Sequence, residues 1–309
     1  MSQTLKNWLL LLFLSCIWGS SFILMKRGMT HNETGTAIFN NHQVATLRML
    51  LASLSMLPFG LFYIKKHLTK RMILPLLGVG FLGNFIPAFL FTYAETGISS
   101  GLTGMLNSAT PIFTILVGAI FYKQSIIKLQ VIGVLIGTLG IIGLVSSGAS
   151  VETSTSLTYV LAVIVATLCY ASSVNIIKFN LNGVGPLIIT AIAFSLTFIP
   201  ALILFFTTDT LTTFKTNTYA WNGFLYIAVL ALVGTSFSVI VFNQLIANSS
   251  PLFASSVTYF IPIIAALIGF WDKEHLTFYQ ILAMGVILIG VFTANVLGRR
   301  KKTPKKVVS

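Results

Sequence analysis

The stretch WLLLLFLSCIWGSSFILM, Trp8–Met25, decides the class of fold, because it offers 18 apolar or small residues without a single charge. A helix needs about 20 such residues to cross the hydrocarbon core of a bilayer. A cleaved signal peptide would have a shorter apolar region followed by a small-residue cleavage site, and no such site follows here. Trp8–Met25 therefore predicts a transmembrane helix.

The rest of the chain is built like this first stretch. Of its 309 residues, 56% are hydrophobic and only 8% are charged, whereas soluble domains carry about 25% charged residues. Lipid must therefore cover much of the surface, and backbone groups in lipid have to be satisfied within each segment, which favours helices. Apolar runs without strand-like alternation predict an all-α polytopic membrane protein with ten spans, at 8–25, 44–64, 73–93, 102–122, 129–147, 157–177, 187–207, 223–243, 253–270 and 278–297.

The basic residues follow the positive-inside rule if both termini lie in the cytoplasm. On that assignment 14 of the 19 Lys and Arg residues lie inside, four lie outside and Arg48 lies within the second span. The net charge of +13 is then explained by segment ends and the tail, not by a nucleic-acid-binding face. We expect a multi-pass protein of the plasma (inner) membrane that contacts lipid and binds no nucleic acid.

The second half of the chain echoes the first. Phe91–Tyr93 returns 151 residues later as Phe242–Gln244, and Trp18–Ser21 returns 152 residues later as Tyr170–Ser173. Each half holds five spans, an odd number, so the second half enters the membrane with the opposite orientation. Such inverted repeats are typical of secondary transporters. The predicted domains are two inverted five-helix repeats, 1–150 and 151–297, and a basic cytoplasmic tail, 298–309.

Several short motifs lie in order along the spans. Trp18–Phe22 with Lys26 follows the pattern W-G-S-x-F-x-x-x-K, and Gln130–Gly140 looks like Q-x-x-G-x-x-L-I-x-x-G through Gln130, Gly133 and Gly140. These motifs resemble those of the EamA-type family of the drug/metabolite transporter (DMT) superfamily. Lys123-Gln124 departs from the Gly-Glu that is usual after span four. The resemblance covers all ten spans and implies export or exchange of small organic metabolites, such as amino acids or drug-like compounds, by alternating access.

Polar and aromatic side chains within the spans are the candidates for substrate binding, since polar groups in a bilayer are costly and often functional. Asn84 lies just before Pro87, and Asn107 lies one helical turn before Pro111, where a proline frees a backbone carbonyl. Interhelical hydrogen bonds and ordinary packing are the alternative roles. We expect the cavity between spans one, three and four and their mates six, eight and nine. The predicted substrate-binding residues are Trp18, Asn84, Tyr93, Asn107, Tyr170, Asn175, Asn243, Gln244 and Tyr259.

Arg48 and Glu95 are candidates for an ion pair or for coupling. Arg48 could pair with Glu95 at the same outer level, extend to the lipid headgroups or attract an anionic substrate. Glu95 is the one acidic residue close enough to a span to couple transport to protons. Because the apolar cores of the spans lack acidic residues, we expect facilitated diffusion or exchange.

Other functions remain open. A nucleotide-sugar or sugar-phosphate carrier would use clustered basic residues in its cavity, and Lys26, Arg48 and Lys178 are scattered. A non-transporting membrane scaffold is also compatible with the helices and the basic tail. An enzyme is not expected, because paired acids, H-E-x-x-H and a Ser-His arrangement are missing from the spans. No catalytic residue, metal or cofactor is predicted.

Glycines on span five indicate close helix packing. Gly133, Gly137 and Gly140 share one helical face through their spacing of four and three residues. This face could pack within the chain or in a homodimer. Spans five and ten, poor in polar residues, are expected at the periphery.

Overall fold

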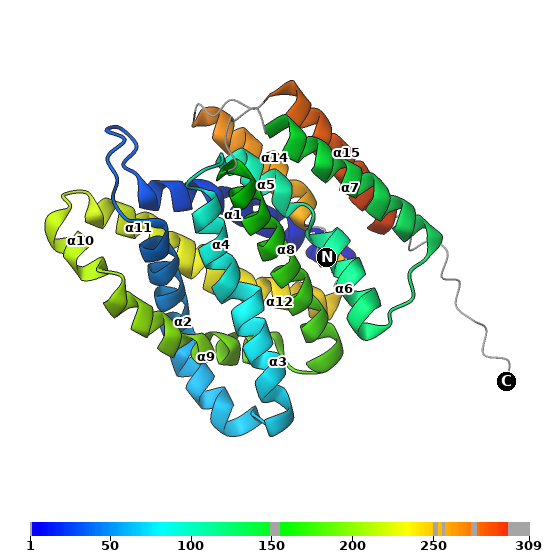
Figure 1. The fold of residues 1–309 in the computed structure, drawn as a ribbon. Helices are drawn as coiled ribbons and strands as arrows, with labels where there is room; N and C mark the ends of the chain where they lie inside the picture. The colour runs from blue at the N-terminus through cyan, green and yellow to red at the C-terminus, as the bar shows by residue number, and fades with distance from the viewer. Residues whose placement is uncertain (1, 149–154, 250–252, 255–256, 273–276, 296–309) are drawn as a thin grey trace.

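The computed structural model describes residues 2–148, 155–249, 253–254, 257–272 and 277–295 as a bundle of helices (Figure 1). Within these ranges the only strand-like contact is an isolated antiparallel bridge between Thr30 and Ala37, so the fold is all-α. The helices are α1 (Gln3–Met29), α2 (Asn41–His67), α3 (Lys70–Gly80), η1 (Phe81–Phe85), α4 (Ile86–Ala94), α5 (Ser100–Asn107), α6 (Thr110–Tyr122), α7 (Lys128–Gly148), α8 (Thr155–Asn180), α9 (Pro186–Thr207), α10 (Thr210–Thr216), α11 (Ala220–Ala231), η2 (Leu232–Phe237), α12 (Ser238–Asn248), α14 (Val257–Trp271) and α15 (Phe278–Asn295).

These helices make ten membrane crossings. In the part of the chain that the structure describes, seven helical segments are long and apolar enough to span a bilayer. Three shorter apolar helices, at 128–144, 257–271 and 278–294, coincide with predicted spans five, nine and ten. The ten-helix polytopic fold predicted from the apolar runs is confirmed. The predicted domain boundary at 150/151 and the predicted tail 298–309 lie outside the described residues.

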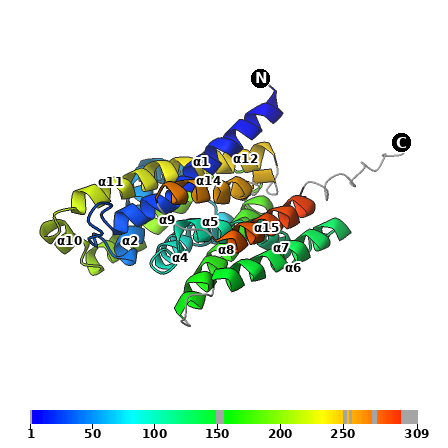
Figure 2. The ribbon, with the colours of Figure 1, turned by 90° about the horizontal axis from the view of Figure 1, so that it is seen from above.

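Equivalent helices of the two halves pack in reciprocal pairs. Helix α1, the first span, lies against α11, α12 and α14 of the second half. Its counterpart α8 lies against α3, α4, α5 and α6 of the first half. Figure 2 shows α1, α11, α12 and α14 beside α4, α5, α6 and α8. Helix α2 also packs on α9, α5 on α14 and α7 on α15, so three further pairs of equivalent spans are in contact.

Glycines bring the backbones of α7 and α15 close together. A Cβ added to Gly290 would lie 2.3 Å from the backbone nitrogen of Gly137, and one added to Gly133 would lie 2.4 Å from the carbonyl oxygen of Gly290. Glycine is needed here because any side chain would separate the two helices. The glycine face predicted on span five therefore packs within the chain, against span ten.

Two crossings are widened by a π-helical turn at equivalent positions. Segment η1 begins at Phe81 and η2 begins at Leu232, which is the 151-residue shift of the repeat. Side chains in both segments bond five residues back: Thr235 Oγ1 donates to the Leu230 carbonyl at 2.9 Å, and Asn84 Nδ2 approaches the Val79 carbonyl at 3.4 Å. Such turns often occur at functional sites.

The fourth crossing is broken, although the sequence predicts a continuous helix over 102–122. Helix α5 ends at Asn107, and α6 begins at Thr110 with Pro111 in its first turn. Pro111 cannot donate an i→i−4 hydrogen bond, and its ring excludes the carbonyl of the preceding turn. An interrupted helix inside a membrane is tolerated where protein or a cavity covers its ends. All eight residues of α5 are buried.

Candidate functional site

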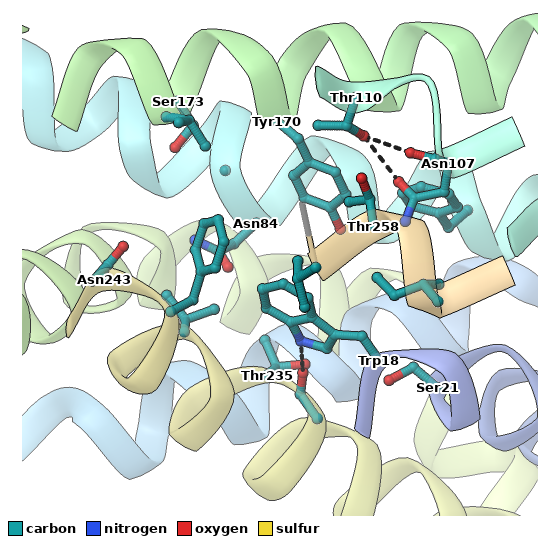
Figure 3. Close-up of a pocket in the computed structure, with 18 of the residues that line it drawn as sticks. Trp18, Ser21, Asn84, Asn107, Thr110, Tyr170, Ser173, Thr235, Asn243 and Thr258 are labelled. Carbon is teal, nitrogen blue, oxygen red and sulfur yellow. Dashed lines mark hydrogen bonds between the residues drawn. The ribbon is translucent and has the colours of Figure 1, made fainter. Parts of the chain in front are cut away.

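A cavity of about 110 Å³ lies between the two halves. Its described walls come from spans one, three, four, six, eight and nine, the set predicted from the sequence, and from Arg48 on span two. In Figure 3, the side chains of Trp18, Tyr170, Asn107 and Thr258 surround a common space. Both π-helical turns and the break between α5 and α6 border this space.

Two aromatic pairs related by the repeat stand on the walls. Trp18 packs against Phe242 with ring centroids 5.0 Å apart, and its Nε1 donates a hydrogen bond to the Gly234 carbonyl at 3.0 Å. Tyr170, the residue equivalent to Trp18, stacks on Phe91 with centroids 5.7 Å apart. Each pair joins the first helix of one half to the third crossing of the other half.

Small residues let these helices approach one another. A Cβ added to Gly83 would lie 2.4 Å from the Ser173 hydroxyl oxygen, and one added to Gly234 would lie 3.2 Å from the Ser21 hydroxyl oxygen. Ser21 and Ser173 are equivalent residues of α1 and α8. The two halves therefore use the same small-residue contact to shape opposite walls.

Amide and hydroxyl groups supply the polar part of the cavity. Asn107 Oδ1 accepts a hydrogen bond from the Thr110 hydroxyl at 3.2 Å, across the break in the fourth crossing. Asn243 Nδ2 donates to the Thr190 hydroxyl at 2.8 Å. Asn84 lines the cavity from η1. These groups offer both donors and acceptors to a small solute.

Arg48 is the cation among the described wall residues. Its side chain is buried, and its Nε donates to the Thr235 hydroxyl at 2.9 Å. Glu95 is not its partner: the Glu95 carboxylate accepts a hydrogen bond from the Ser100 hydroxyl at 2.8 Å. The ion pair considered from the sequence is thus not formed, because α2 directs Arg48 toward η2.

Two predicted site residues, Tyr93 and Asn175, lie outside the described lining of the cavity. The Tyr93 ring packs against Tyr159 with centroids 4.9 Å apart. Asn175 Nδ2 donates to the carbonyls of Thr114 and Ala171, at 3.0 and 2.9 Å. Asn175 thus makes the interhelical hydrogen bond that was the alternative role for a buried asparagine.

Gln244 and Tyr259 also lie outside this lining. Gln244 Nε2 donates to the Asn248 side chain one turn later, at 2.8 Å, on an exposed face. The Tyr259 hydroxyl donates to the Val291 carbonyl of α15 at 3.3 Å. The structure therefore brings Trp18, Arg48, Asn84, Asn107, Tyr170 and Asn243 together at the cavity, and not Tyr93, Glu95, Asn175, Gln244 or Tyr259.

Several wall residues were missed because they are hydroxyl residues, which are common in membrane helices. The repeat could have found them. Ser21 and Ser173 match at a shift of 152, and Thr235 matches Asn84 at a shift of 151. Thr110 neighbours Pro111 at the break of the fourth crossing.

Equivalent lysines hold helix ends at some distance from the aromatic pairs. Lys26 Nζ lies 2.9 Å from the carboxylate of Asp272, just beyond α14. Lys178, its equivalent, donates to the Gln124 side chain at 2.9 Å, just beyond α6. The first bond joins an ammonium to a carboxylate, and the second joins an ammonium to a neutral amide.

No group of three or more His, Cys, Asp or Glu side chains that could hold a metal ion occurs in the part of the chain that the structure describes. The chemistry available at the cavity is therefore that of hydrogen bonding, aromatic packing and one guanidinium charge. This suits recognition of a small organic compound.

Comparisons with known proteins agree with this architecture. The EamA-like transporter family matches the chain twice, over residues 6–146 and 157–296. The chain is 27% identical over 307 residues to the "Uncharacterized inner membrane transporter YedA" of Escherichia coli K12, covering 95% of this chain and 91% of that protein. It is 23% identical over 310 residues to the "Probable amino-acid metabolite efflux pump" of the same strain, covering 98% and 99%.

A solved crystal structure supports the fold alone. It aligns with a TM-score of 0.60 at 14% sequence identity and covers 97% of this chain and 100% of the solved one. Two copies of the family domain, ten crossings and a cavity between the copies lead to one conclusion. The chain belongs to the EamA-like transporter family and is a multi-pass transporter of the inner membrane.

Proposed function

We propose that this protein is a secondary transporter that exports or exchanges small organic metabolites, such as amino acids or drug-like compounds, by alternating access. The observation that carries the proposal is the cavity shared by equivalent residues of both halves, with Trp18 against Phe242 and Tyr170 against Phe91. Two near-equivalent halves can exchange their conformations and so open a fixed site to either side.

The named relative supports the substrate class. The Escherichia coli protein that aligns with 98% of this chain is named "Probable amino-acid metabolite efflux pump". The cavity offers aromatic walls, amide groups and a guanidinium, which together fit a small solute with an apolar body and polar ends.

We further propose that transport proceeds by facilitated diffusion or exchange, driven by the concentration gradients of the transported compounds. A proton relay in a membrane uses buried carboxylates or histidines, and the described lining of the cavity contains neither. A sugar-phosphate or nucleotide-sugar carrier is less well supported, since the described lining holds a single cation, Arg48, for a multiply charged phosphate.

Transport by full-length protein in proteoliposomes tests the proposal. We expect vesicles loaded with a mixture of amino acids and small metabolites to take up the labelled form of at least one of them by counterflow, at rates unaffected by collapsing a pH gradient. Protein-free vesicles are the control. Uptake that vanishes with the pH gradient would contradict facilitated diffusion, and no uptake across a broad panel would contradict transport.

A further inference from the structure

Arg48 is a cavity cation without a counterpart in the second half. The residues 150 to 152 positions later are Phe198, Ile199 and Pro200, none of which carries a charge. Arg48 is 8% exposed, and no Asp or Glu occurs among the described residues that line the cavity. A buried guanidinium without a carboxylate nearby is costly to the folded protein. An anionic group bound in the cavity would offset that cost.

The guanidinium is held along one edge. Its Nε donates to Thr235, whose own hydroxyl is tied to the Leu230 carbonyl by the π-helical turn η2. One terminal nitrogen lies 3.7 Å from the Met25 sulfur, and the Tyr170 hydroxyl lines the same cavity as a second uncharged partner. A thioether is a poor acceptor, whereas a guanidinium has five N–H donors in a planar fork. The fork is therefore oriented, and its partners among the described residues are uncharged.

The helix that carries Arg48 is itself fixed on η2. The Ser55 and Ser236 hydroxyls lie 2.9 Å apart, and Ser236 also donates to the Ala52 carbonyl at 3.2 Å. These bonds lie one to two turns beyond Arg48 on α2. They join α2 to η2 beside the cavity wall that carries the charge.

Apolar surface adjoins the charge. Trp18 with Phe242, and Tyr170 with Phe91, supply two aromatic walls in the same cavity. A bound compound that places an anion on Arg48 would extend its remaining atoms between these rings. A planar anion with two oxygens matches the guanidinium fork, and a doubly charged phosphate would need a second cation, which the described lining does not offer.

We propose that Arg48 binds the carboxylate of the transported compound, and that the substrates are small organic monocarboxylates with an apolar or aromatic body. This inference rests on the proposed transport function and names its substrate class. It applies to simple carboxylic acids and to amino acids alike, because both present the same carboxylate to Arg48. In amino acids, the ammonium group would meet the amide oxygens of the cavity.

Binding of matched acids and amides to the full-length protein in detergent tests the proposal. The probes are 3-phenylpropanoate, phenylalanine, 3-phenylpropanamide and phenylalaninamide, measured by titration calorimetry. We expect each acid to bind at least about tenfold more tightly than its amide, because hydrogen bonds to charged groups exceed neutral ones. Comparison of the two acids shows whether simple carboxylates or amino acids are preferred.

Variants assign this discrimination to Arg48. We expect Arg48→Gln to reduce the acid-to-amide ratio to about one, and Arg48→Lys to give an intermediate ratio, because lysine keeps the charge but loses the fork. The matched control is Arg71→Gln, which removes an exposed arginine in the first turn of α3 and should leave the ratio unchanged. Thermal unfolding verifies that each variant is folded. If Arg48→Gln does not fold, the acid-to-amide ratio of Arg48→Lys tests the proposal instead.

Three results would overturn the proposal: an acid-to-amide ratio that persists without Arg48, wild-type protein that prefers the amides, or wild-type protein that binds neither acid. Counterflow separates this failure from failure of the proposed function. Transport of neutral or cationic compounds without carboxylate binding would support the proposed transport function and contradict the carboxylate site. Carboxylate binding without transport of any compound would support the carboxylate site and contradict the proposed transport function.

Discussion

Thr235 links a special backbone conformation to the buried charge of Arg48. Its hydroxyl accepts a hydrogen bond from Arg48 Nε and donates one to the Leu230 carbonyl five residues earlier. The second bond exists because the π-helical turn η2 places that carbonyl within reach. The hydroxyl of Thr235, positioned by the π-helical turn, thus fixes the position of the Arg48 guanidinium.

Replacing Thr235 tests this link without knowledge of the substrate. Thr235→Val leaves the Arg48 Nε without its acceptor, and we expect a loss of about 1–3 kcal/mol in the free energy of unfolding. Thr235→Ser keeps the hydroxyl and should keep most of the stability. The measurement is thermal unfolding in detergent, and equal midpoints for wild type, valine and serine variants would show that Thr235 does not hold Arg48.

At the scale of elements, the apolar helices could be predicted and their interruptions could not. Length and hydropathy alone place a helix over Trp8–Met25, because any such run must satisfy its backbone in lipid. The π-helical turns η1 and η2 could not be predicted, because one extra residue in a turn does not change the hydropathy of the apolar run that contains it. The break after Asn107 was missed although Pro111 is visible, because proline kinks some membrane helices and interrupts others.

The cavity residues, too, could be predicted only in part from the sequence. Trp18, Tyr170 and the asparagines Asn84, Asn107 and Asn243 could be located at the cavity because the repeat places them on matched helices. Asn175 could not be distinguished from them, since a buried asparagine that bonds a neighbouring helix has the same local sequence as one that faces a cavity. Only the rotation of α8 about its axis separates the two cases.

The pair α7–α15 gives a prediction for a single element. Gly290→Ala would place a Cβ 2.3 Å from the Gly137 nitrogen, and we expect a loss of about 1–3 kcal/mol from overpacking. The control is Gly285→Ala on the same helix, whose Cβ would meet nothing within 4 Å among the described residues. Thermal unfolding compares the two, and an equal midpoint for both variants would contradict close packing of these helices.

At the scale of the whole molecule, the odd number of spans in each half places the two repeats in opposite orientations. The reciprocal packing of α1 and α8 fits that relation, since each lies against the other half. The direction of the whole bundle in the membrane is a separate matter, and the basic residues predict cytoplasmic termini.

Single cysteines test that direction. In protein with Cys16 and Cys169 replaced by serine, we expect Glu33→Cys, between α1 and α2, to react in intact cells with a membrane-impermeant thiol reagent. Thr69→Cys, between α2 and α3, should react only after the cells are opened. Both positions are exposed. The reverse pattern of labelling would show that the termini lie outside.

The central claim is that solutes cross through the cavity between the repeats, and plugging that cavity tests it most directly. Thr258 lines the cavity from α14, whereas Ile263 on the same helix is 41% exposed on the outer surface of the bundle. The measurement is counterflow into proteoliposomes by Thr258→Phe and Ile263→Phe, with thermal unfolding to verify both proteins. We predict that Thr258→Phe abolishes uptake while Ile263→Phe retains it; equal uptake by the two folded variants would contradict a pathway through this cavity.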